Sequence, residues 1–137
     1  MVYMVINTKT GKAEYVASNS PDLFVLKADA SEPVALKGQG FPLGLTKNLE
    51  DTDFTHKIVH LEVGDMIIGY SDALTEEPHT TGARWLDDGF LEVLKETQEC
   101  SKTNKENTRF EYIYNKFDET VVKPLTDDLT FVGITRK

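Results

Sequence analysis

The hydrophobic pattern of this chain changes once, near Ser71, and that change limits the fold class more than any other feature. Before Ser71, short apolar runs separated by turn residues predict strands, whereas the longer segments after it have the spacing of helices. A final apolar run at 129–134 predicts one more strand. Strands, then helices, then a closing strand indicate an α+β protein with mainly antiparallel β-sheets and flanking helices. The 137 residues fit a single domain, or a segment of one, over 1–137.

The first half of the sequence predicts paired strands. The runs 2–7 and 13–17 flank a polar turn at 8–11, a pattern that is typical of a hairpin. The run 66–70 is continuously apolar, as expected of a central strand that is buried on both faces. The runs 23–26 and 34–36 form a second expected pair around the polar turn at 29–32, and one more strand is expected over 57–62.

Two helices are expected in the second half of the sequence. Asp87 or Asp88 is a suitable N-cap for the first helix, whose apolar face would carry Phe90 and Leu94. The second helix covers 104–122, where apolar side chains recur at the spacing of one helical stripe. The residues of this stripe are Phe110, Ile113, Tyr114, Phe117 and Val121.

Composition and net charge limit the classes of binding partner and the cellular compartment that are expected. The formal net charge is −8 at pH 7, which disfavours a nucleic-acid backbone or an anionic membrane as the main partner. No apolar run approaches the roughly 20 residues of a membrane-spanning helix. Cys100 is the single cysteine, so the chain has neither an internal disulfide nor a Cys-x-x-Cys metal site. These features predict a cytoplasmic protein that binds neither nucleic acid nor membrane.

Three aspartates stand next to expected strands. Asp72 comes directly after the run 66–71, and Asp127 and Asp128 come directly before the strand at 129–134. If these two strands are neighbours, the carboxylates converge at one end of a sheet. Hard cations such as Mg²⁺ and Mn²⁺ prefer oxygen ligands and offset the repulsion between carboxylates. The alternative is that Asp72 is a loop acid and that the other two aspartates are turn and cap residues.

The histidines and the tryptophan give weaker signals. His56 and His60 would share one face of a strand, which permits a zinc pair, although a solvated sheet face is the simpler interpretation. His79 lies in the polar loop 76–82 and would be either a surface residue or part of a flap that faces a substrate. Trp85 is expected to anchor the core.

Four segments in a fixed order are similar to motifs of one protein family. They are 5–15 (VINTKTGKAEY), 40–45 (GFPLGL), 61–76 (LEVGDMIIGYSDALTE) and 126–132 (TDDLTFV). These segments resemble the VLDPRTGRLTY hairpin, the GxPLGL loop, the LxPGDxLLLYTDGVTE segment and the closing DDITLV strand of metal-dependent protein phosphatases of the PPM type, in the SpoIIE/RsbU branch. Because they span nearly all of 2–134, the chain resembles the later part of that catalytic domain.

The resemblance implies an α-β-β-α sandwich that holds two divalent cations, Mg²⁺ or Mn²⁺, at one edge. By position, Asp72 matches the aspartate of the family's DG motif and Asp127 the first aspartate of its DD motif, both of which are metal ligands in the family. Asp128 matches the second DD position, which supports the metal site. The implied reaction is hydrolysis of phosphoserine or phosphothreonine by a metal-activated water. The implied partner is a phosphorylated regulatory protein of the anti-anti-sigma type.

The sequence also departs from the family pattern. Ala73 replaces the glycine after the metal aspartate, and the segment 19–22 replaces a GHPP turn without its histidine. The family's upstream aspartate cluster has no counterpart, so we expect an incomplete metal site that binds its cation weakly. The chain would be a segment of a larger phosphatase or a short, catalytically silent relative that binds proteins. Sheet edges and an apolar face left open by missing strands would favour a homo-oligomer.

Overall fold

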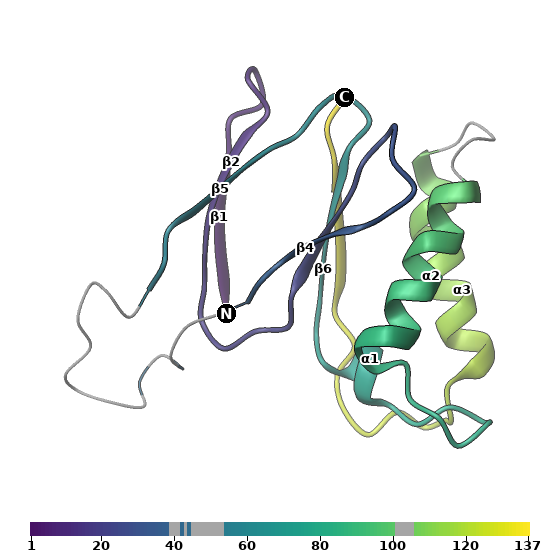
Figure 1. Cartoon of the computed structure of the whole chain (residues 1–137). Helices are drawn as coiled ribbons and strands as arrows, with labels where there is room; N and C mark the ends of the chain where they lie inside the picture. Colours follow the sequence, from purple (N-terminus) through teal and green to yellow (C-terminus); the bar gives the residue numbers. More distant parts are fainter. Residues whose placement is uncertain (39–41, 43, 45–53, 101–105) are drawn as a thin grey trace.

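The computed structural model describes residues 1–38, 42, 44, 54–100 and 106–137 (Figure 1). Its elements form three layers: a three-stranded sheet, a four-stranded sheet, and a pair of helices on the outer face of the four-stranded sheet. This arrangement confirms the expected α+β class, with antiparallel sheets and flanking helices. Apart from Pro42 and Gly44, the expected loop 40–45 lies outside the described residues.

Seven strands build the two sheets, and every pairing between them is antiparallel within the described part of the chain. The strands are β1 (Val2–Ile6), β2 (Lys12–Ala17), β3 (Leu23–Leu26), β4 (Val34–Leu36), β5 (Lys57–His60), β6 (Met66–Tyr70) and β7 (Phe131–Thr135). The three-stranded sheet has the order β1–β2–β5, and the four-stranded sheet has the order β4–β3–β6–β7. The sequence-based pairing of β1 with β2 and of β3 with β4 is therefore confirmed.

The turn between β1 and β2 sets the register of the first hairpin. The side-chain oxygen of Asn7 accepts hydrogen bonds from the backbone N–H groups of Lys9 and Thr10, at 3.0 and 3.1 Å. Gly11 closes the turn with φ +74°, and a Cβ there would stand 2.2 Å from the carbonyl oxygen of Leu61, so only glycine fits. The resulting register turns alternate residues of β2 into the space between the sheets.

Strand β6 is the centre of the molecule. It lies between β3 and β7, and its residues Met66, Ile67 and Ile68 are each at most 3% exposed. Ile67 packs into the core between the two sheets, whereas its two neighbours pack into the core under the helices. This burial on both faces explains the absence of polar residues from the run and confirms the expected central strand.

A buried aspartate fixes the turn that leads into β6. The carboxylate of Asp65 is 1% exposed and accepts hydrogen bonds from the backbone N–H groups of Glu62 and Ala28, at 2.8 and 2.9 Å. The Lys27 ammonium lies 2.7 Å from the same carboxylate. Burial acts to raise the pKa of Asp65, but Lys27 and the two N–H groups outweigh it and hold that pKa below its ordinary value of 3.8. The ionised side chain ties the turn to the end of β3.

The helices are α1 (Ala73–Glu76), α2 (Leu86–Cys100) and α3 (Glu106–Thr120). Helix α2 begins at Leu86, so Asp87 and Asp88 lie in its first turn and the expected cap role is wrong. In α3 the apolar stripe is confirmed at Phe110, Ile113 and Phe117. Val121 is buried but lies directly after the helix, and Tyr114 is 47% exposed.

The outer face of the three-stranded sheet has no helical cover among the described residues (Figure 1). On this face Tyr3, Val5 and Ile58 are 66%, 54% and 51% exposed. The described layers therefore correspond to the α-β-β part of an α-β-β-α sandwich. None of the helices in the described ranges is both long and apolar enough to cross a lipid bilayer.

Candidate functional site

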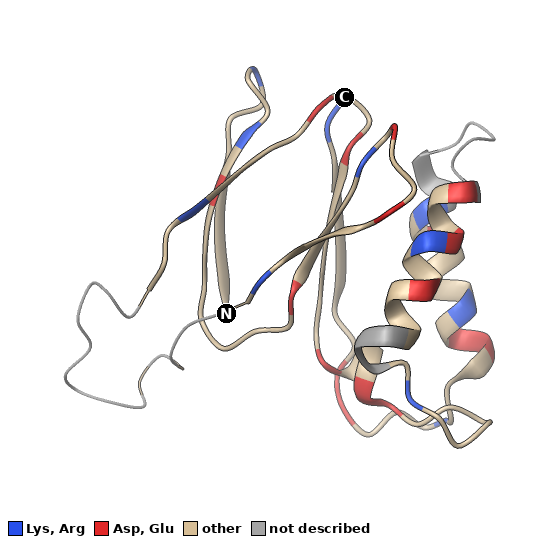
Figure 2. Ribbon diagram, in the orientation of Figure 1, with Lys and Arg blue, Asp and Glu red and all other residues tan. Residues whose placement is uncertain are grey.

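The pairing of β6 with β7 brings the predicted site aspartates to one end of the four-stranded sheet. Tyr70, the last residue of β6, pairs with Phe131, the first residue of β7. Asp72 follows β6 and Asp127 precedes β7, so the antiparallel pairing places both segments at the same end. Figure 2 shows acidic residues on both segments at this end of the sheet, next to α1. The expected adjacency of the two strands is thus confirmed.

Asp72 and Asp127 line one small pocket of about 150 Å³. The other acidic residues that line it are Glu76 and Glu77, and Arg84 adds a positive charge. Asp128 is not among the residues that line this pocket, and its role as a metal-supporting residue stays a prediction. The structure therefore brings two of the three predicted aspartates together in one concave site.

Each of the two aspartates has one oxygen held by a neighbouring backbone group. Asp72 caps helix α1, where its Oδ1 accepts a hydrogen bond from the Ala73 N–H at 3.1 Å. Asp127 Oδ1 accepts a hydrogen bond from the Asp128 N–H at 2.7 Å. Both residues are exposed, and the second oxygen of each carboxylate makes no hydrogen bond with any residue in the described ranges. These second oxygens are available to a ligand.

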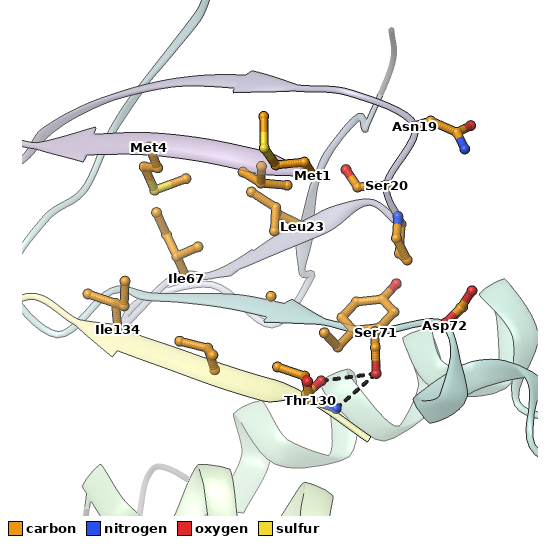
Figure 3. A pocket seen from close by; sticks show the side chains of 15 residues that line it. Met1, Met4, Asn19, Ser20, Leu23, Ile67, Ser71, Asp72, Thr130 and Ile134 are labelled. Atoms are coloured by element: carbon orange, nitrogen blue, oxygen red, sulfur yellow. Dashed lines mark hydrogen bonds between the residues drawn. The ribbon is translucent and has the colours of Figure 1, made fainter. Parts of the chain in front are cut away.

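Ser71 fixes one side of the loop that carries Asp127. Its hydroxyl donates a hydrogen bond to the carbonyl oxygen of Asp128 at 3.0 Å and accepts one from the Thr130 N–H at 2.9 Å. The Ser71 N–H also donates to the Thr130 carbonyl oxygen at 2.8 Å. Figure 3 shows the bond between Ser71 and Thr130, with Asp72 next to them at the end of the strand. Ser71 and Asp72 are consecutive, so the loop is fixed directly beside the first aspartate.

Glu77 fixes the other side of the same loop, and sequence reasoning missed it. Its Oε1 accepts hydrogen bonds from the Thr126 N–H and hydroxyl, both at 2.7 Å, and from the Asp127 N–H at 2.9 Å. The side chain is 2% exposed. Its other oxygen, Oε2, is buried and has no hydrogen-bond partner among the residues that the structure describes. In the sequence Glu77 is one acid of a polar loop, and its partners lie 49 and 50 positions away.

The environment of Glu77 favours the ionised carboxylate. The hydrogen bond from the Thr126 hydroxyl is the largest cause, and it lowers the pKa of Glu77 below its ordinary value of 4.5. Burial opposes this effect, while the backbone N–H groups of Thr126 and Asp127 and the charge of Arg84 reinforce it. Glu77 is therefore a buried anion at the wall of the aspartate pocket.

The side chains of the pocket fit a hard divalent cation in their chemistry. Carboxylate oxygens are the ligands that Mg²⁺ and Mn²⁺ prefer. However, the described residues contain no group of three or more His, Cys, Asp and Glu side chains placed to hold a metal ion. Within the described ranges Asp72 and Asp127 therefore do not form a complete ligand set, and their role as metal ligands stays a prediction.

The histidines take other positions. His56 is exposed and lies 3.0 Å from Glu14 on the outer face of the three-stranded sheet, and His60 is also exposed, in agreement with a solvated sheet face. His79 is 4% exposed and packs between the rings of Trp85 and Phe117, at 5.0 and 6.1 Å. Both expectations for His79, a surface residue or a flap, are therefore wrong, because local polarity hides its aromatic contacts. Trp85 packs against the core, as predicted.

A second, larger cavity of about 520 Å³ lies between the two sheets and reaches Asp72. Apolar side chains of the strands line most of it, including Met4, Leu23, Ile67 and Ile134 (Figure 3). The polar residues Ser71 and Asp72 lie at one end of it. The space between the sheets therefore opens toward the aspartate site.

Solved structures share this fold. The RsbU and RsbW domains of Rv1364c from Mycobacterium tuberculosis match 99% of this chain with 20% identity and a TM-score of 0.77. The phosphatase domain of the cell fate determinant SpoIIE from Bacillus subtilis, presoaked with Mn, matches 98% with 16% identity and a TM-score of 0.68. RsbX in complex with magnesium matches 96% with 16% identity and a TM-score of 0.59. At these identities the likeness shows a common fold.

The matched region is only part of each of these proteins. This chain spans 35%, 55% and 53% of the three solved chains, respectively. No curated protein sequence matches the chain significantly. The sequence profile of the family described as Stage II sporulation protein E (SpoIIE), in contrast, matches residues 1–137. With its full length covered by that profile, the chain belongs to the SpoIIE family.

Proposed function

We propose that this chain carries part of the active site of a metal-dependent protein serine/threonine phosphatase. The observation that carries the proposal is the pocket shared by Asp72 and Asp127, the two residues that match the family's metal aspartates by position. Membership of the SpoIIE family and the likeness of the fold to phosphatase domains support the same function.

In this function Asp72 and Asp127 bind the cation through their free carboxylate oxygens. The N–H groups of Ala73 and Asp128 hold the other oxygens and so fix the direction of both carboxylates. A bound Mg²⁺ or Mn²⁺ would supply Lewis acidity toward the phosphoryl group and lower the pKa of the attacking water. Because both aspartates are exposed at the end of a sheet, a phosphorylated side chain on another protein has access to them.

Arg84 provides the positive charge that a phosphoryl group requires from the protein. It lines the pocket with the two aspartates, and its side chain is exposed. A guanidinium group binds phosphate through paired, charge-assisted hydrogen bonds. We assign Arg84 the role of holding the phosphoryl oxygens of phosphoserine or phosphothreonine while the aspartates hold the cation.

The proposed substrate is a phosphorylated regulatory protein of the anti-anti-sigma type in the cytoplasm. The resemblance of the four sequence motifs to the SpoIIE/RsbU branch supports this substrate class. The small volume and open position of the aspartate pocket, about 150 Å³, suit a single phosphorylated side chain. A large buried metabolite would need a more enclosed site.

A second candidate is a catalytically silent module that uses the same scaffold to bind a protein. Two observations favour it. The described residues offer no cluster of three metal-binding side chains, and Ala73, which is 2% exposed, lines the pocket at the position where the family has glycine. In that case the acidic residues serve as caps and loop anchors.

Binding of Mn²⁺ distinguishes these two functions. We expect titration of the purified chain, followed by the electron paramagnetic resonance signal of free Mn²⁺, to show weak binding of a single ion. Asp72→Asn and Asp127→Asn should each abolish it, because each removes an anionic ligand. Asp118→Asn is the matched control, since Asp118 is exposed on α3 and pairs with Lys123 at 2.6 Å.

The possible outcomes separate the functions clearly. Binding that depends on both site aspartates and survives the control substitution supports the phosphatase site. Absence of binding at millimolar Mn²⁺, or binding that neither site substitution weakens, overturns it and favours the silent module.

A further inference from the structure

We propose that Glu77 is a positioning residue that holds the Asp127 backbone at a fixed place relative to Asp72. Glu77 is not one of the residues that match the family's metal motifs. It is the C-cap of α1, the short helix whose N-cap is Asp72. The proposal rests on contacts at both ends of Glu77, namely its backbone within α1 and its carboxylate on the opposite loop.

The backbone of Glu77 is rigidly connected to Asp72. Asp72 is the N-cap of α1 and Glu77 is its C-cap, and the Glu77 N–H donates to the Ala73 carbonyl oxygen at 3.3 Å. The Asp72 carbonyl oxygen accepts hydrogen bonds from the N–H groups of Thr75 and Glu76, at 2.9 and 2.8 Å. A single turn of helix therefore sets the spacing between the two acidic residues.

The segment after Glu77 is anchored in the core. The Pro78 carbonyl oxygen accepts a hydrogen bond from the Val122 N–H at 2.9 Å. The ring of His79 packs against Trp85 and Phe117. Because the backbone is fixed on both sides of Glu77, its side chain has little freedom to move. The loop that carries Thr126 and Asp127 is therefore held at the position of the Glu77 carboxylate.

The carboxylate end meets three donors from two consecutive residues. Oε1 accepts the N–H and the hydroxyl of Thr126 and the N–H of Asp127, all between 2.7 and 2.9 Å. Hydrogen bonds to a charged acceptor are stronger than neutral ones. Because Thr126 and Asp127 are themselves exposed, no apolar packing of their own side chains fixes this part of the loop. The hydrogen bonds to Glu77 therefore restrain this part of the loop in place of apolar packing.

Amide hydrogen exchange in the absence of any cation tests the restraint directly. We expect Glu77→Ala to speed exchange at the Thr126 and Asp127 amides by at least about tenfold, while exchange at Ile68 in the central strand stays unchanged. Glu77→Gln should restore protection, because its carbonyl oxygen accepts the same hydrogen bonds. Glu76→Gln is the matched control, since Glu76 lines the same pocket but makes no hydrogen bond to the loop within the described ranges.

Mn²⁺ affinity then separates positioning from a purely structural role. This second readout rests on the proposed function. Glu77→Ala should weaken Mn²⁺ binding with the fold intact, and Glu77→Gln should restore most of it. If Glu77→Ala does not fold, Thr126→Val removes one donor from an exposed position and should speed exchange at Asp127 alone.

The two proposals fail in different ways. Unchanged exchange at Thr126 and Asp127 in Glu77→Ala overturns the role of Glu77 whatever the chain does with Mn²⁺. If that variant does not fold, unchanged exchange at Asp127 in Thr126→Val overturns it. Faster exchange with unchanged Mn²⁺ affinity also overturns it, because the loop is then held without consequence for the site. Wild-type protein that binds no Mn²⁺ overturns the proposed phosphatase site instead.

Discussion

Thr126 donates both its backbone N–H and its hydroxyl to the same oxygen of Glu77, each at 2.7 Å. This double hydrogen bond joins the end of α1 to the loop before β7. Glu77 is buried and holds the backbone of a distant loop, whereas Asp72 and Asp127 are exposed and accept a hydrogen bond only from the residue that follows each of them. In the described part of the chain, each of these two aspartates keeps one oxygen without a hydrogen bond.

The chain by itself should be a poor phosphatase. In the proposed site Asp72 and Asp127 would provide only part of a ligand set, and Mg²⁺ or Mn²⁺ held by few carboxylates keeps most of its water shell. A loss of several kcal/mol of transition-state stabilisation lowers the rate by orders of magnitude, since a factor of ten corresponds to about 1.4 kcal/mol. We expect slow, Mn²⁺-dependent release of phosphate from a phosphoserine peptide.

Two variants accompany this measurement. Asp127→Asn should remove the residual activity, and Arg84→Ala should raise the peptide concentration needed for half-maximal rate. Rapid turnover by the wild-type chain, abolished in Asp127→Asn, would contradict the expectation and show that other residues complete the site.

Replacing the buried aspartate Asp65 should destabilise the fold. Asp65→Asn removes the charge that binds Lys27 and leaves one amide group opposite N–H donors, so we expect a loss of about 2–3 kcal/mol in the free energy of unfolding. Urea denaturation followed by circular dichroism measures it. Asp118→Asn, which breaks an exposed ion pair with Lys123, should cost less than about 1 kcal/mol.

The lowered pKa of Asp65 also predicts that the stability of the fold depends on pH in the acidic range. The folded protein lowers the pKa of Asp65, so its contribution is complete above the ordinary value of 3.8 and is lost as the pH falls through the lower folded value. The difference in stability between wild type and Asp65→Asn should therefore shrink as the pH falls below about 3.8. A difference that stays constant down to the acid transition would refute this.

His79 predicts a second dependence on pH, in a higher range. Burial lowers the pKa of this imidazole from its ordinary value of 6.5, because the charged form would be buried beside Trp85 and Phe117 with its Nε2 lacking a hydrogen-bond partner among the described residues. The unfolded chain then binds a proton more readily than the folded one. Stability should fall as the pH is lowered below about 6.5 and should be constant above it.

Replacement of His79 by phenylalanine tests this origin. His79→Phe keeps the aromatic contacts and removes the titrating group, so the slope of stability against pH between neutral pH and about 5 should decrease. His56→Gln is the control, since His56 is exposed. An equal slope in wild type and His79→Phe would assign the dependence to other groups.

Self-association is expected from the uncharged edge strand β1. Strand β1 lies at the edge of its sheet, contains no charged residue, and exposes Tyr3 and Val5. Exposed apolar edges pair with strands of other chains. Light scattering at micromolar concentration should show a dimer or larger species, and Val5→Lys should shift it toward monomer. A monomeric wild-type chain would contradict the expected homo-oligomer.

The sequence pattern predicts burial more faithfully than strand limits. Leu129 was expected to begin the last strand, yet β7 begins at Phe131. Leu129 packs against the helical core all the same, while Thr130 hydrogen-bonds with Ser71 outside the strand. At this position the apolar residue marks contact with the core, although the strand itself starts two residues later.

The residues of the site that lie at strand ends could be predicted from the sequence. The residue that binds distant backbone N–H groups, Glu77, could not. Asp72 and Asp127 follow from the adjacency of two apolar runs. Glu77 binds N–H groups of residues far away in the sequence, and backbone donors leave no pattern of side chains to detect. For the same reason the burial of His79, which arises from rings on α3 and before α2, could not be seen in its polar loop.

Strands β6 and β7 are neighbours in the sheet, although both long helices lie between them in the chain. A ribosome synthesises the chain from its N-terminus, so Asp72 emerges well before the segment that carries Asp127. During that interval the edge of β6 that later pairs with β7 is open, and an open strand edge can pair with strands of other chains. Translation that stops before residue 127 yields a polypeptide with Asp72 but without Asp127, so this acidic pair is complete only after both long helices have been synthesised.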